Sequence, residues 1–242
     1  MSWRRPARLG PEAAELLDEG AGTPEEEVEA YRLLEAVNRR LGGYEVTRRA
    51  LALVPFDAGP APLYLDIAGG DGAFAEWLAA RPPDGSRAIV LDRNAVALEE
   101  SRGRPGVRAL RADALRLPIR DRSVDCAHCA AFFHHLGVND ARALLVEMCR
   151  VARRAVVVND LVRSWPATGA IWALSRLLTD NRLVRFDGPL SVRKAFVPAE
   201  LAALAHAAAT GRAGGGPPHA AEYRWSLVGA FPYRMALVGV RA

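Results

Sequence analysis

Three carboxylates and a glycine cluster in the first half of the chain have the types and spacing of a nucleoside-binding corner. Asp66 lies near the end of an apolar stretch at residues 63–67, and glycines follow within residues 69–72. Asp92 ends the next apolar stretch, and Asp113 follows the one after it. Glycine lets backbone N–H groups approach a ligand, and a following helix N-terminus adds partial positive charge. Acids at the ends of successive strands then predict a nucleoside bound along one edge of a parallel sheet.

The acids beside the glycine turn separate two kinds of nucleotide site. A dinucleotide site uses the spacing G-x-G-x-x-G and must tolerate a pyrophosphate. Here Asp66 stands before the turn and Asp71 stands inside it. Carboxylates in these places repel a pyrophosphate and attract an ammonium or sulfonium group. A nicotinamide-dependent oxidoreductase stays as an alternative of another class, although the chain has no Tyr-x-x-x-Lys pair to move protons.

Residues 66–72 resemble motif I of the class I S-adenosylmethionine-dependent methyltransferases, which usually reads D-x-G-x-G-x-G. Ala68 replaces the first glycine of that pattern, so we expect a backbone φ below zero there, with Gly69 supplying the missing flexibility. The resemblance extends in motif order through residues 63–160. It implies S-adenosylmethionine as the cofactor.

The same resemblance assigns the other cofactor contacts. Asp92 looks like the acid of motif II, which accepts both ribose hydroxyls, and its two oxygens match those paired donors. Asp113 looks like the acid of motif III, which takes the adenine amino group, with the Ala114 backbone facing the ring. The cofactor-binding set implied in this way is Asp66, Ala68, Gly69, Gly70, Gly72, Asp92, Arg93, Asp113, Ala114, Cys129 and Ala130.

Two adjacent histidines follow the expected fourth strand, in the place of a common H-H-L turn of the family. Transfer of a methyl group to a hydroxyl requires removal of a proton, and histidine titrates near neutrality. We therefore expect His135 to be the catalytic base, with His134 as the second candidate. The alternative is that His135 only shapes the turn and His134 packs against it. Asp160 and His128 are further, weaker candidates.

The periodicity of the chain predicts an α/β fold. The resemblance implies a Rossmann-like, seven-stranded, mostly parallel sheet with helices on both faces and an antiparallel C-terminal strand. Alternating residues at 222–228 and 233–240 predict the hairpin that ends such a sheet. Helical spacing at 11–17, 23–37 and 43–53 predicts a helical cap, so we divide the chain into a cap at 1–54 and a catalytic domain at 55–242.

A long insertion at about 161–197 follows the expected fifth strand, where open α/β sheets place their substrates. We expect a helix followed by a loop through residues 180–196, acting as a substrate lid; the alternative is a helix that merely covers the sheet edge. The next helix is expected to break in the glycine- and proline-rich run at 211–218. The expected acceptor-binding residues are Phe132, Phe133, Trp165, Trp172 and Arg193.

Cys126 and Cys129 could be interpreted as a metal-binding or redox pair. They fall in a predicted strand, where residues three apart point to opposite faces, and no second ligand pair follows at zinc spacing. We interpret them as buried structural thiols. Because the acidic metal cluster of catechol-type enzymes is also missing from the sequence, we expect metal-independent transfer.

Composition limits the partners. Half of the 242 residues are hydrophobic, which excludes wholesale disorder, and no apolar run approaches the roughly 20 residues that span a bilayer. The start has no apolar segment typical of a secretion signal, so we expect a cytoplasmic protein without a membrane partner. The net charge is +4, but acids and bases are interleaved and Arg does not cluster with aromatic residues, so we expect no nucleic-acid partner. A homodimer stays open.

The aromatic and apolar residues of the cap and insertion favour a small, largely apolar or aromatic methyl acceptor. By analogy with bacterial family members of similar layout, O-methylation in secondary metabolism is the preferred prediction. C- or N-methylation of a quinone- or amine-type acceptor is the first alternative. A non-catalytic S-adenosylmethionine-binding module is the second.

Overall fold

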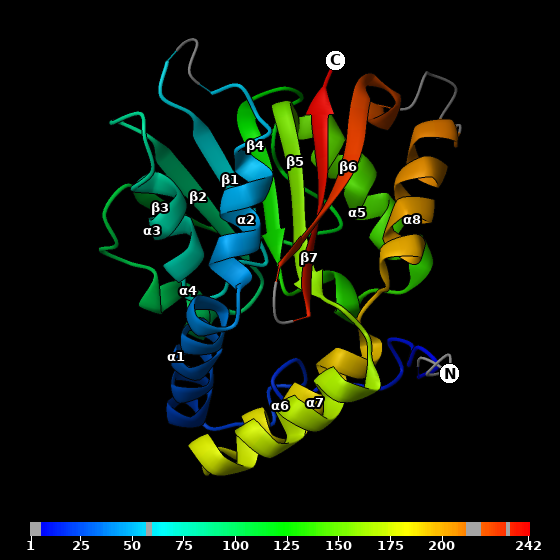
Figure 1. The fold of residues 1–242 in the computed structure, drawn as a ribbon. Coiled ribbons are helices and arrows are strands. Elements are labelled where there is room, and N and C mark those ends of the chain that lie inside the picture. The colour runs from blue at the N-terminus through cyan, green and yellow to red at the C-terminus, as the bar shows by residue number, and fades with distance from the viewer. Residues whose placement is uncertain (1–5, 57–59, 212–218, 231–232) are drawn as a thin grey trace.

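The computed structural model describes residues 6–56, 60–211, 219–230 and 233–242 (Figure 1). Its centre is a single sheet of seven strands in the order β3-β2-β1-β4-β5-β7-β6. The first five strands are parallel, and β7 runs antiparallel between β5 and β6. The predicted fold class and its terminal hairpin are therefore confirmed. The strands are β1 (Leu63–Ile67), β2 (Arg87–Asp92), β3 (Val107–Arg111), β4 (Val124–Ala130), β5 (Ala152–Leu161), β6 (Tyr223–Ala230) and β7 (Arg234–Arg241).

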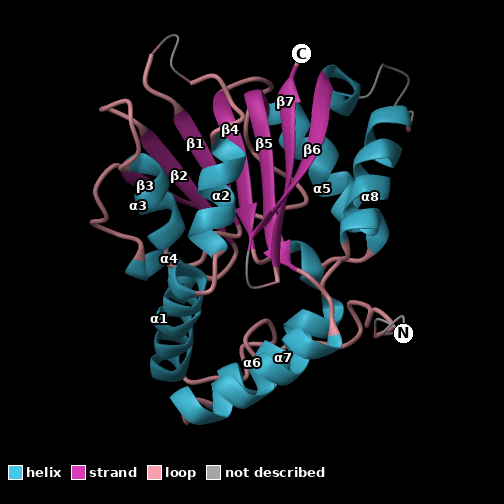
Figure 2. Ribbon diagram, in the orientation of Figure 1, coloured by secondary structure: helices cyan, strands magenta, loops and turns pink. Residues whose placement is uncertain are grey.

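Helices cover both faces of the sheet (Figure 2). One apolar cluster joins the sheet to α2, α3 and α4, and a second joins its other face to α5 and α8. Cys126 belongs to the first cluster and Cys129 to the second, as the alternation of a strand requires. Burial raises the pKa of both thiols, which are free and structural. These helices are α2 (Gly43–Leu51), α3 (Ala73–Ala79), α4 (Ala95–Glu100), α5 (Val138–Val151) and α8 (Pro198–Thr210).

Three further helices lie beyond the carboxyl ends of the parallel strands (Figure 1). Helix α1 (Pro24–Arg40) begins at a capping box in which Thr23 and Glu26 satisfy each other's backbone N–H groups. Helices α6 (Trp165–Leu178) and α7 (Arg182–Lys194) pack against each other in the insertion after β5. Short 3-10 turns, η1 (Phe133–His135) and η2 (His219–Glu222), follow β4 and precede β6.

Two local predictions were wrong. Residues 11–20 form turns instead of a helix, because the Leu16 and Leu17 N–H groups donate to the Asp187 carboxylate at 2.8 and 3.0 Å instead of to helical carbonyls. Residues 182–194 form α7 instead of a loop, despite Pro189 inside it. Asn181 caps that helix, and its apolar face is buried, which outweighs the proline.

The predicted break at 211–218 and the centre of the terminal hairpin fall largely outside the described residues. Within the described ranges, no helix has the length and apolar character needed to cross a membrane.

Candidate active site

The glycine turn after β1 forms the expected corner, but with a strained residue in it. Ala68 has φ +54°, in the left-handed region that disfavours side chains, so the predicted negative φ was wrong. Gly70 and Gly72 also have positive φ, at +56° and +76°. Ala68 thus adopts a conformation that favours glycine, the residue type that the motif usually has at this position.

Replacing Ala68 by glycine should therefore relieve backbone strain. We expect Ala68→Gly to raise the free energy of unfolding by about 0.5–1 kcal/mol, because the left-handed conformation costs about 1–2 kcal/mol for alanine and part of the gain is lost to the flexibility of the unfolded chain. Thermal or urea unfolding measures this. Ala73→Gly, in the first turn of α3, is the matched control and should destabilise. Equal losses in both variants would contradict the strain.

Gly69 has a different role from the one expected. Its φ is not positive; instead, a Cβ at this position would lie 2.6 Å from Asp66 Oδ2 and 2.8 Å from Val90 Cγ2. Asp66 is fully buried, and its Oδ2 has no hydrogen-bond partner among the described residues. A buried carboxylate oxygen without a partner, packed closely against a residue that has no side chain, suits a cationic ligand group.

Asp92 stands at the end of β2 with both carboxylate oxygens directed at this corner. Oδ2 accepts the Gly70 N–H at 2.9 Å, and Oδ1 accepts the Asn94 N–H at 2.9 Å. Burial raises the pKa of Asp92, partly offset by these backbone donors. The acid is thus fixed between the glycine turn and the start of α4, and the remaining lone pairs of its two oxygens can accept further donors such as ribose hydroxyls.

The cap covers the same corner from outside. The Tyr31 ring lies 3.0 Å from where a Cβ of Gly70 would stand, and its hydroxyl accepts from Asn94 Nδ2 at 3.3 Å. Glu27 accepts from the same amide at 3.2 Å. Helix α1 therefore closes over the turn, a contact that its amphipathic pattern alone did not reveal.

Of the remaining predicted cofactor residues, three lie at strand ends or in the turn after β3, and one is enclosed in the core. Asp113 is exposed and its Oδ1 accepts the Leu115 N–H at 2.9 Å, so its carboxylate is held in its own turn beside the buried Ala114. Ala130 is half-buried at the end of β4. Cys129 is fully buried in the apolar cluster on the α5 side of the sheet, and we no longer assign it a cofactor contact.

His134 is locked into the protein. The Asp160 carboxylate, at the end of β5, accepts its backbone N–H and faces its Nδ1, each at 2.8 Å. Burial alone would lower the pKa of His134, but the charge and hydrogen bond of Asp160, aided by Glu15, raise it above its ordinary value. Asp160 has its own pKa lowered by His134, against the effect of burial. This pair anchors the turn after β4.

His135 is the more accessible of the two histidines. Its side chain is 18% exposed against 3% for His134, and its ring stacks on Phe132 at 5.8 Å. Its Nδ1 is hydrogen-bonded to the Asp18 carboxylate. His135 lowers the pKa of Asp18 although burial alone would raise it. A carboxylate on Nδ1–H fixes the tautomer in which Nε2 carries the lone pair, as a general base requires.

Asp18 also connects this histidine to the cofactor corner. Arg93, the residue after Asp92, places Nη2 3.6 Å from Asp18 Oδ1. The predicted cofactor residue and the predicted base therefore meet on one carboxylate. Sequence reasoning missed Asp18 because it follows the segment at 11–17 that was expected to be helical, and its partners are distant in sequence.

Glu15 faces both histidines from the same segment. Its oxygens lie 3.8 Å from His134 Nε2 and 3.7 Å from His135 Nε2, and the three groups could together ligate a metal ion. However, the buried Lys194 ammonium lies 3.1 Å from Glu15 Oε1, and Ser191 donates to Oε2 at 2.9 Å. Since Lys194 already supplies positive charge there, we assign no metal to this cluster.

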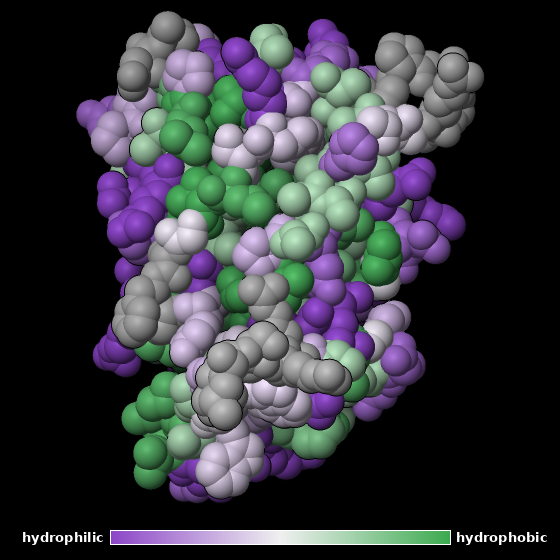
Figure 3. Space-filling model, turned by 45° about the vertical axis from the view of Figure 1, so that its right-hand side comes forward, coloured by the Kyte–Doolittle hydropathy of each residue, from purple (hydrophilic) through white to green (hydrophobic). Residues whose placement is uncertain are grey.

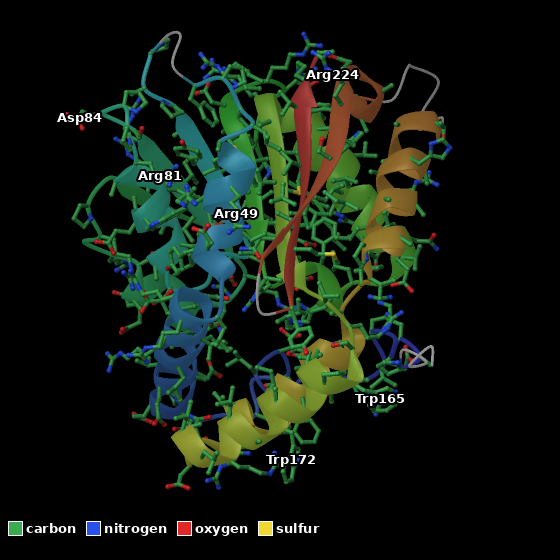
Figure 4. All side chains as sticks on the ribbon, in the orientation of Figure 1. Arg49, Arg81, Asp84, Trp165, Trp172 and Arg224 are labelled. Carbon is green, nitrogen blue, oxygen red and sulfur yellow. The ribbon has the colours of Figure 1, made fainter. Side chains whose placement is uncertain are left out.

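Of the expected acceptor-binding residues, one lies beside His135 and the others lie elsewhere. Phe132 lies beside His135, whereas Phe133 is fully buried in the core. Trp165 and Trp172 point away from the sheet (Figure 4), half exposed on the outer side of α6, and Arg193 lies over the Trp165 ring at 5.7 Å. In the space-filling view, hydrophobic side chains lie at the left edge of this lower end, and a larger group lies over the upper half of the molecule (Figure 3). Only Phe132 of the set directly contacts the His135 ring.

The Asp160–His134 pair predicts a pH-dependent stability. We expect Asp160→Asn to lower the free energy of unfolding by about 1–3 kcal/mol, because a buried charged hydrogen bond is lost. Because the pKa of Asp160 is lowered, its charge stabilises the fold fully above the ordinary value of 3.8. Because the pKa of His134 is raised, its charge stabilises the fold fully below the ordinary value of 6.5. The wild-type advantage should be largest between these values and shrink on both sides. Unfolding curves at pH 3, 5 and 8 measure it; a constant difference would contradict the charged pair.

Comparison with known proteins agrees with this architecture. Residues 65–155 match the family model described as a methyltransferase domain. The search of curated protein sequences found no significant match.

Solved structures share the fold at low sequence identity. A magnesium protoporphyrin IX methyltransferase from Synechocystis PCC 6803, with bound SAH, is 14% identical with a TM-score of 0.53, over 82% of this chain and 83% of that chain. A SAM-dependent methyltransferase from Aquifex aeolicus is 15% identical with a TM-score of 0.52, over 82% and 98%. One from Thermotoga maritima is 17% identical with a TM-score of 0.57, over 89% and 96%.

The order of the seven strands and the methyltransferase-domain match over residues 65–155 agree with the fold of the class I methyltransferases that the sequence motifs resemble. The sequence motifs predict S-adenosylmethionine as the cofactor of this site. The unpaired Asp66 oxygen, its close approach to the side-chain-free Gly69 and the fixed Asp92 carboxylate are the features of this chain that fit that molecule.

Proposed function

We propose that the protein O-methylates a small, largely apolar or aromatic acceptor, with His135 as the general base. The observation that carries this proposal is the contact between His135 and Asp18. Of the two adjacent histidines, His135 is the partly exposed one, and Asp18 also pairs with Arg93 of the cofactor corner. The bound cofactor supplies an electrophilic methyl group on its sulfonium.

The residues of this chain do the rest. Asp66 and the glycine turn hold the cationic end of the cofactor, and Asp92 holds the ribose. Asp18 orients His135 so that Nε2 can accept the proton of the acceptor hydroxyl. Phe132 offers an apolar ring against which an aromatic acceptor packs. His134 and Asp160 position the turn without touching the substrate.

Glu15 occupies the position beside His135 that the acceptor needs. The Glu15 carboxylate lies 3.8 Å from Nε2 of His134 and 3.7 Å from Nε2 of His135. The acceptor hydroxyl must therefore replace this carboxylate beside His135. Residues 15–18 are attached to α7 through Asp187, Ser191 and Lys194. Acceptor binding would therefore require movement of this segment relative to α7.

A panel of acceptors with a methyl-labelled cofactor tests the proposal. Matched compounds that carry a hydroxyl, an amine or an activated carbon on the same aromatic ring should differ, and we expect label only on the hydroxyl member. Label on the amine or carbon member would replace O-methylation by the corresponding alternative. Cofactor binding without transfer to any member would favour a non-catalytic binding module.

A further inference from the structure

A buried line of hydrogen bonds runs from the cofactor corner to the cap. His128 Nδ1 lies 2.7 Å from Asp66 Oδ1, and His128 Nε2 lies 3.2 Å from Thr47 Oγ1. Asn159 Nδ2 donates to Thr47 Oγ1 at 2.9 Å and to the Gly43 carbonyl at 2.8 Å. The side chains of this line are at most 1% exposed, so water does not compete with any of these bonds.

The direction of each bond follows from its partners. The carboxylate of Asp66 accepts, so Nδ1 of His128 carries the hydrogen. Thr47 Oγ1 accepts from the Asn159 amide and is hydrogen-bonded to Nε2 of His128. The Nδ1–H of His128 then points at Asp66, and the Thr47 hydroxyl holds the opposite nitrogen of the ring.

The ring of His128 is also fixed by packing. Phe74 lies against it with ring centroids 4.7 Å apart, and Tyr44 stacks on Phe74 at 4.2 Å. His128 therefore cannot turn away from Asp66 without disturbing both α2 and α3. This rigidity contrasts with the other oxygen of Asp66, which is buried, unpaired and directed at the glycine turn.

We propose that His128 is a positioning residue that binds Asp66 Oδ1 and thereby reserves Oδ2 for the ammonium group of the cofactor. A carboxylate free to rotate could present either oxygen to the ligand or turn toward other donors. The hydrogen bond from His128 selects one arrangement, and Thr47 and Asn159 tie that arrangement to helix α2 of the cap. Selectivity for the amino-acid part of the cofactor thus depends on a residue that does not touch it.

Two ligands separate this role from a purely structural one. S-adenosylhomocysteine carries the amino-acid part, whereas 5′-methylthioadenosine keeps the adenosine and thioether but lacks it. We would measure the Kd of each ligand by calorimetry for wild type, His128→Phe and His128→Asn. Asparagine can place its amide near the position of Nδ1 and so keeps the donor to Asp66, whereas phenylalanine has none. Cys126→Ala, on the same strand and equally buried, is the matched control.

We expect His128→Phe to reduce the preference for S-adenosylhomocysteine by about tenfold or more, and His128→Asn and Cys126→Ala to keep it within about threefold. Affinity for 5′-methylthioadenosine should hardly change. Equal weakening of both ligands, or an unchanged preference in His128→Phe, would overturn the proposal. Should His128→Phe not fold, His128→Gln replaces it, since its amide reaches toward Thr47 instead of Asp66. Failure of the wild type to bind either ligand would contradict the cofactor identification instead.

Discussion

His135→Ala is expected to lower kcat for transfer to a hydroxyl by about 10²–10⁴-fold while the affinity for S-adenosylhomocysteine stays unchanged. The reason is geometric: His135 is partly exposed and holds Asp18 on Nδ1, with Glu15 3.7 Å from its Nε2, whereas His134 is buried between Asp160 and Glu15. Removing the ring removes the proton acceptor but leaves the glycine corner intact. Single-turnover transfer of labelled methyl, together with calorimetric titration, measures both quantities.

The control for this variant is His206→Ala, an exposed histidine on α8, which should keep full activity. The kcat of Asp18→Asn should lie between those of the two variants. The His135 ring stays, but the hydrogen bond that favours its tautomer with the lone pair on Nε2 is weakened. An undiminished rate in His135→Ala would remove this residue as the base. A loss of cofactor binding in the same variant would show that its role is structural.

Asp92→Ala is expected to weaken S-adenosylhomocysteine binding by about 1–3 kcal/mol, or roughly tenfold to a hundredfold. Two effects combine: the ligand loses its paired acceptor, and the Gly70 and Asn94 N–H groups lose the carboxylate that orders them. Calorimetry measures the affinity, and thermal unfolding separates it from a loss of folded protein.

Asp84→Ala is the matched control for Asp92. Asp84 is exposed at the opposite end of the sheet (Figure 4), so its removal should leave the affinity unchanged. Equal affinity in wild type and Asp92→Ala would mean that the ribose binds elsewhere. Equal weakening by both substitutions would point to a general charge effect, which added salt would screen.

Short-range pattern explains why the fold was predictable. The glycine turn, the acids at strand ends and the alternating C-terminal segments each report a local conformation, and their order resembles a family whose sheet has this arrangement. The opposite faces of Cys126 and Cys129 followed from strand periodicity alone. Motif-level resemblance likewise located Asp66 and Asp92.

The errors occurred where distant residues decide local structure. Ala68 adopts φ +54° because the surrounding turn requires it, against the preference of alanine. Residues 15–17 are not helical because distant residues bind their polar groups. Asp187 accepts the Leu16 and Leu17 N–H groups, and Lys194 pairs with the Glu15 carboxylate, across about 170–180 residues of sequence. For the same reason Asp18 could not be paired with His135 beforehand. The Trp165 and Trp172 side chains looked suitable for a pocket, but helix α6 turns them outward (Figure 4).

Calorimetric titration with S-adenosylhomocysteine, with NADPH as the control ligand, tests the central claim most directly. The cofactor corner described here predicts micromolar binding of S-adenosylhomocysteine, lost or strongly weakened in Asp92→Ala, and no binding of NADPH. Binding of NADPH alone, or of neither ligand to folded protein, would contradict the assignment of the glycine corner and the mechanism that depends on it.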